Sequence, residues 1–79
     1  MNILSAVVKT RREDLRGVEE ALKTLGWCEV HFVDEHGKIV VTFECDDQKG
    51  AMEKMRAIER VAKVVSAELA YAYIGDVDD

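Results

Sequence analysis

The chain repeats one pattern of strand, amphipathic helix and strand, and this repeat restricts its fold more than any other feature. Residues 3–9 are apolar and β-branched, residues 10–26 have helical spacing, and residues 27–34 alternate in polarity. Residues 38–45, 46–62 and 64–73 repeat that order. When residue n is compared with residue n + 37, Val8 matches Cys45 and Cys28 matches Val65. The sequence therefore predicts two copies of one βαβ unit.

Each half contains one helix whose apolar residues share a single stripe. Thr10 and Glu13 have the spacing of a capping box and Gly26 suits a left-handed C-cap, so we expect the first helix between them. Asp46 and Asp47 are suited to cap the second helix. The stripes are Leu15, Val18, Leu22 and Leu25 in the first helix, and Met52, Met55, Ile58 and Ala62 in the second.

A doubled βαβ unit with a short link between its halves predicts a ferredoxin-like α+β fold, in the order βαββαβ. Its antiparallel sheet has strand order 4-1-3-2, and both helices cover the same face. Residues 1–79 are expected to form a single domain, because a chain this short has room for one thin core. The acidic residues 75–79 are expected to form a flexible tail.

Strict alternation along the strands determines which side chains lie on the uncovered face of the sheet. It assigns Phe32, Val65, Leu69, Tyr71 and Tyr73 to the core side. The uncovered side then receives Ile3, Ser5 and Val7; Glu29, His31 and Val33; Lys38, Val40, Thr42 and Glu44; and Ser66, Glu68, Ala70 and Ala72.

This uncovered face has an apolar middle and acidic edges. Contiguous exposed apolar area is typical of a binding surface, although scattered surface hydrophobes are also common, so a merely solvated face stays open as the alternative. Carboxylates at the edges favour a partner with positive charge, and small alanines leave room for it. The predicted binding residues are Ile3, Ser5, Val7, Glu29, Val40, Thr42, Glu44, Glu68, Ala70 and Ala72.

Composition and charge exclude several classes of protein. With 48% hydrophobic and 34% charged residues and no apolar run of about 20 residues, the sequence predicts a soluble globular chain without a membrane span. Its net charge of −5 opposes a phosphate backbone and argues against nucleic acid. The N-terminus lacks the basic start and apolar segment of a signal peptide, so we expect a cytoplasmic location.

The polar residues do not form a catalytic or metal-binding motif, so we expect neither an enzyme nor a cofactor. His31 and His36 lack partners at ligand spacing, and Cys28 and Cys45 are expected to be reduced. Arg11 and Arg12 fall where the first helix should start. There they are either a solvated pair or an anion site formed with the free helix amides, and the sequence leaves both open.

Several segments together resemble the NapD family of small cytoplasmic chaperones. They are NILSAVVKT, GWCEVHFVDEHGKIVVTFE and VVSAELAYAY, and the similarity runs from Asn2 to about Tyr73. Members of this family often have Pro before the glycine that ends the first helix and a Pro-Gly pair after the second, where this chain has Leu25 and Ala62-Lys63. The resemblance implies binding of the twin-arginine signal peptide of the periplasmic nitrate reductase catalytic subunit, which delays export until the molybdenum cofactor is inserted.

Two other functions use the same fold. A regulatory module could self-associate into a homodimer or bind a small ligand through the uncovered face. A hydrolase similar to acylphosphatase would use an arginine near position 11 or 12, but the asparagine that such an enzyme needs on a neighbouring strand is missing, since the one asparagine is Asn2.

Overall fold

The computed structural model describes residues 2–74, and the side-chain environments of residues 3–70. In chain order the elements are β1 (Asn2–Thr10), the 3₁₀ turn η1 (Arg12–Asp14), α1 (Leu15–Thr24), β2 (Cys28–Asp34), β3 (Lys38–Cys45), α2 (Gln48–Glu59) and β4 (Val64–Ile74). Within this described part, no helix is long and apolar enough to cross a membrane.

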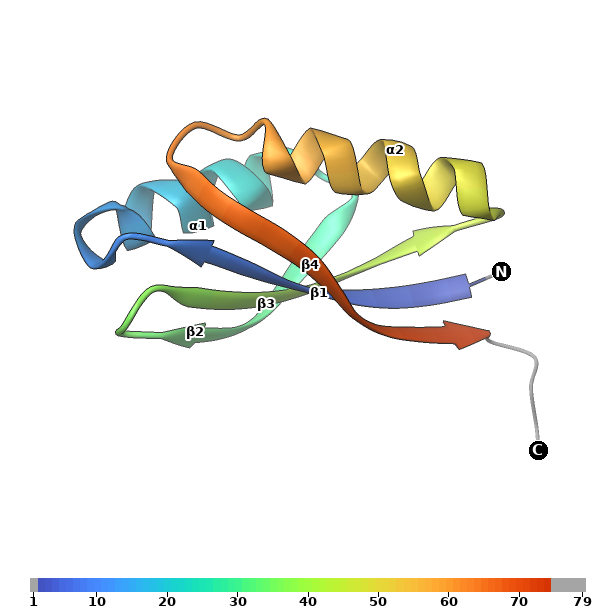
Figure 1. The fold of residues 1–79 in the computed structure, drawn as a ribbon, viewed down its shortest axis with the longest axis horizontal. Coiled ribbons are helices and arrows are strands. Elements are labelled where there is room, and N and C mark those ends of the chain that lie inside the picture. Colours follow the sequence, from blue (N-terminus) through green and yellow to red (C-terminus); the bar gives the residue numbers. More distant parts are fainter. Residues whose placement is uncertain (1, 75–79) are drawn as a thin grey trace.

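The four strands form one antiparallel sheet in the order β2-β3-β1-β4. This is the predicted order, counted from the other edge of the sheet. Figure 1 shows α1 and α2 over the same face of the sheet, with the opposite face free of helices. The ferredoxin-like α+β prediction is therefore confirmed, and the sheet has one uncovered face, called the open face below.

The core lies between the sheet and the two helices. Val18 and Leu22 of α1 and Ile58 of α2 are at most 1% exposed, and they meet the inward side chains of the two central strands. Along β1, Leu4, Ala6 and Val8 are buried while Ile3 is exposed, so alternation is correct for this strand. The predicted stripe of α2 is less complete, because Met52 is 51% exposed and Ala62 lies beyond the end of the helix.

The helix boundaries follow local chemistry, with one exception. Gly26 has φ +82° after α1, and the carboxylate of Asp47 accepts a 2.8 Å hydrogen bond from the Gly50 amide at the start of α2, as predicted. The capping box at Thr10 is wrong, because β1 continues through Thr10 and α1 begins at Leu15. The Thr10 hydroxyl instead donates to the Lys63 carbonyl at 2.9 Å, which joins the end of β1 to the loop before β4.

A bulge in β2 overturns part of the predicted alternation. The pairing with β3 shifts between Val30 and Phe32, so that Phe32 lies opposite Val40 and Val33 lies opposite Ile39. Since Ile39 is fully buried, Val33 packs against the core, whereas Phe32 is 55% exposed. Val33 was predicted on the open face and Phe32 in the core, and both predictions are wrong for the same reason.

Strand β4 is irregular in two places, between its pairings with Ser5 and Ala6 and between those with Lys9 and Thr10 of β1. Val65 is 66% exposed, and Leu69, although paired with the buried Ala6, is 49% exposed, so neither is buried as alternation predicts. Beyond the shift between Ser5 and Ala6, Ala72 pairs with Leu4, a core position of β1, and not with an open-face residue. The side chains of Tyr71, Ala72 and Tyr73 lie outside the described residues, as does the acidic tail at 75–79.

Both cysteines are free thiols, as predicted. Burial raises the pKa of the Cys28 and Cys45 thiols above the ordinary value, which leaves less of the reactive thiolate at neutral pH.

Candidate functional site

The open face is organised in rows that cross the sheet, because directly paired residues point to the same side. The apolar row is formed by Phe32, Val40 and Val7, which are paired in succession across β2, β3 and β1. Val7 and Val40 are half-buried by their neighbours, and Glu68 of β4 is paired with Val7 at the far edge. Three adjacent apolar side chains thus face solvent on the side of the sheet that no helix covers.

A polar row lies next to the apolar one. It contains Glu29, Thr42 and Ser5, again paired in succession. His31 sits at the β2 bulge, and its Nε2 lies 2.6 Å from the Thr42 hydroxyl and 3.4 Å from Oε1 of Glu29. The Glu29 side chain stays 79% exposed, so its carboxylate remains accessible to a partner.

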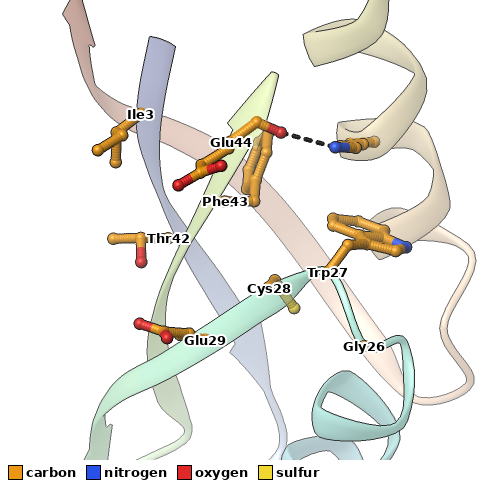
Figure 2. Close-up of a pocket in the computed structure, with 9 residues that line it drawn as sticks. Ile3, Gly26, Trp27, Cys28, Glu29, Thr42, Phe43 and Glu44 are labelled. Atoms are coloured by element: carbon orange, nitrogen blue, oxygen red, sulfur yellow. Dashed lines mark hydrogen bonds between the residues drawn. The ribbon is translucent and has the colours of Figure 1, made fainter. Parts of the chain in front are cut away.

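Ile3 and Glu44 form the next row, beyond the point where β2 starts. Figure 2 shows Ile3, Thr42, Glu29 and Glu44 pointing to the same side of the strands, while Trp27 points to the other. These residues line a hollow of about 430 Å³ at the start of β2. A second carboxylate, from Glu44, therefore lies near Glu29 beside the exposed Ile3.

The helix side of this hollow is lined by packed aromatic rings. Trp27 and Phe43 make an edge-to-face contact with ring centroids 5.7 Å apart. The Lys54 ammonium lies 5.4 Å from the Trp27 ring centroid and donates a 2.6 Å hydrogen bond to the Glu44 carbonyl (Figure 2). Lys54 thus engages the backbone of Glu44 and not its side chain, whose carboxylate makes no ion pair with another described residue.

The open face thus has an apolar row with carboxylates at both edges of the sheet, Glu29 on β2 and Glu68 on β4, on a chain of net charge −5. Comparison with protein families gives a match to the family described as NapD protein, over residues 1–76. The chain belongs to the NapD family. This confirms the resemblance seen in the sequence, and it covers nearly the whole chain.

A solved structure agrees with the NapD assignment. The chain is similar to the solution structure of the E. coli Tat proofreading chaperone protein NapD, with a TM-score of 0.78 and 21% identity. The similarity covers 98% of this chain and 82% of that one. At this identity the likeness shows a shared fold. No curated protein matches the chain.

The structure of this NapD-family chain brings most of the predicted binding residues to one face. Pairing and exposure place Ile3, Ser5, Val7, Glu29, Val40, Thr42, Glu44 and Glu68 on the open face. Ala70 is exposed at the β4 bulge, where it has no pairing partner in β1. Glu68 lies at the opposite edge of the sheet from Glu29, and Glu44 lies two rows from the apolar row, so the three glutamates do not form one cluster. Their role in binding remains a prediction.

Phe32 is the open-face residue that alternation missed. Counting alternate residues backward from the turn would have found it. The three-residue turn at 35–37 pairs Asp34 with Lys38, which places Asp34 on the open face, and alternation from Asp34 then places Phe32 there too. Counting from Cys28 places Phe32 in the core instead. The two counts disagree only if an extra residue is inserted in β2, so the conflict itself indicates a bulge.

Two other polar features were considered from the sequence, a metal site and the pair Arg11 and Arg12. Within the described residues, no group of three or more His, Cys, Asp or Glu side chains comes together as metal ligands. Arg11 forms an ion pair with Glu13 two residues away. Arg12 lies near Arg16 and His36 at the other end of the molecule from Glu44, beside the turn that joins β2 to β3.

Proposed function

We propose that this NapD-family chain is a cytoplasmic chaperone that binds the twin-arginine signal peptide of a periplasmic nitrate reductase catalytic subunit. By holding that peptide, it delays export until the cofactor has been inserted. One observation carries the proposal: the apolar row of Phe32, Val40 and Val7 has no helix over it and is bordered by exposed carboxylates. Family membership supports the same role.

The chemistry of such a peptide matches this surface. A twin-arginine signal has a basic pair followed by a moderately apolar segment. The apolar segment would cover the apolar row, and the guanidinium groups would meet Glu29 and Glu44. Since exposed ion pairs each contribute only about 0.2 to 1 kcal/mol, the apolar contact supplies most of the affinity and the carboxylates supply encounter rate and position.

The test compares two double variants that change the net charge equally. Glu29→Lys with Glu44→Lys reverses charges on the open face, and Glu53→Lys with Glu59→Lys reverses exposed charges on α2. Titration calorimetry and stopped-flow kinetics measure binding of a synthetic twin-arginine peptide. We expect the open-face variant to lose about tenfold in affinity, and the helix variant to lose much less. Equal losses would refute the placement of the basic pair on the open face.

A second variant adds bulk at the predicted peptide-binding surface. Ala70→Arg adds a bulky cation at an exposed position of β4 and should weaken peptide binding while leaving the unfolding temperature nearly unchanged. Unchanged affinity would count against the open face as the site. Gel filtration with and without peptide separates this function from self-association, because a dimer formed through the same face would dissociate when the peptide binds.

A further inference from the structure

Two lysines lie directly opposite one another at one end of the open face. Lys9 of β1 pairs with Lys38 of β3, one position beyond the buried pair of Val8 and Ile39, so both point to the open side. Both are exposed, and neither makes an ion pair with another described residue. Like charges directly across a sheet are destabilising, and this pair is therefore suited to an external negative partner.

The carboxylate paired with Lys38 offsets the charge of the two lysines only in part. Asp34 is paired with Lys38, but its Oδ1 accepts a 2.9 Å hydrogen bond from the His36 amide in the turn. On the other side Lys9 faces Ser66, which carries no charge. A net positive charge thus remains at this end of the open face.

The charges give the open face a direction. Glu44 lies in the row of Ile3, and the lysines lie six residues further along β1, a distance of about 20 Å at the rise of an extended strand. Glu29 is one row inward from Glu44, and the apolar row lies between Glu29 and the lysines. A partner with one positive and one negative end would therefore bind in one orientation.

The structure also restricts the conformation of that partner. The backbone groups of β1 and β3 already bond to strands on both sides, so a peptide lying across the face must satisfy its own backbone hydrogen bonds. A helix does so, and about 13 helical residues span about 20 Å. The carboxyl end of a helix carries a partial negative charge on its free carbonyl groups, which cations stabilise.

Building on the proposed function, we propose that the open face binds its signal peptide in one direction. The basic pair lies at the Glu29 and Glu44 end. The apolar segment crosses Phe32, Val40 and Val7 as a helix. The last carbonyl groups of that helix lie over Lys9 and Lys38.

The first experiment reads the direction itself. Synthetic twin-arginine peptides carry a nitroxide label at either end, and broadening of the amide signals of the isotope-labelled chain is measured by NMR. We expect the amino-terminal label to broaden Ile3 and Glu44, and the label after the apolar segment to broaden Lys9 and Lys38. The reverse pattern would overturn the direction and leave the proposed function standing. Binding without broadening on the open face, or no binding, would overturn both.

The second experiment asks whether removal of lysine charges weakens or tightens peptide binding. Lys9→Gln with Lys38→Gln should weaken binding of the amidated peptide by about threefold, because the helix end loses its cations. Lys23→Gln with Lys49→Gln removes the same charge from exposed sites on the helices and should tighten binding slightly, since the chain becomes more negative. If removal of Lys9 and Lys38 tightens binding as much as the control does, the lysines do not face the helix end.

Discussion

Truncation of Phe32 to alanine tests the apolar row at its most exposed residue. A phenylalanine side chain of about 200 Å² that is 55% exposed leaves about 110 Å² for a partner to cover. At about 25 cal/mol per Å² this area is worth about 2.7 kcal/mol if it is buried completely. A helix on the open face covers only the side that it contacts, so about half of this, roughly 1.4 kcal/mol, is expected from Phe32→Ala.

That difference corresponds to a dissociation constant about tenfold higher for a twin-arginine peptide. Titration calorimetry measures it directly, and thermal unfolding checks that the variant is folded. The loss of stability should be small, because more than half of the side chain already faces solvent.

Met52→Ala is the matched control. Met52 is 51% exposed, close to the value for Phe32, but it lies on α2, a helix on the opposite face of the sheet. We expect its truncation to leave peptide affinity unchanged. If Phe32→Ala binds as tightly as wild type, or if both truncations weaken binding equally, the apolar row is not the contact surface.

Three further predictions concern the scaffold. Gly37→Ala should destabilise the fold by more than about 2 kcal/mol, because the new Cβ would lie 2.2 Å from the Thr10 carbonyl oxygen and the residue has φ +113°. Gly17→Ala, with open space around it on α1, should stabilise the fold by about 0.5 to 1 kcal/mol. Urea unfolding that ranks the two variants otherwise would contradict the steric argument. Lys63→Gly should raise the unfolding temperature by about 5 °C, because glycine adopts the φ of 76° found at this position without the steric cost of a Cβ atom. Lys63→Ala keeps the Cβ atom and should give no such gain. Because burial raises the pKa of the Cys45 thiol, iodoacetamide should alkylate it more slowly in the folded chain than in urea at the same pH, and equal rates by mass spectrometry would argue against its burial.

Lys63, in the loop between α2 and β4, adopts the left-handed conformation that glycine prefers. The hydrogen bond from the Thr10 hydroxyl to the Lys63 carbonyl helps to hold this conformation. A contact between distant parts of the chain therefore accompanies a local backbone conformation that lysine rarely adopts.

Local periodicity was sufficient to predict the order of elements, the sheet topology and the existence of an uncovered face. Such patterns are set by neighbours along the chain, and β1 follows its alternation because it is paired on both sides by other strands. The same reasoning placed Glu29, Val40, Thr42 and Glu44 correctly on the open face.

Only the tertiary structure decided where the alternation breaks. The edge strand β2 contains one register shift and the edge strand β4 contains two, and the shift in β2 exposes Phe32 and brings Val33 to the core. An edge strand has one neighbour, so it can insert an extra residue where the turn at one end and the core at the other demand different registers. The competition between these two registers involves the whole hairpin. Alternating polarity along a single strand therefore does not reveal it.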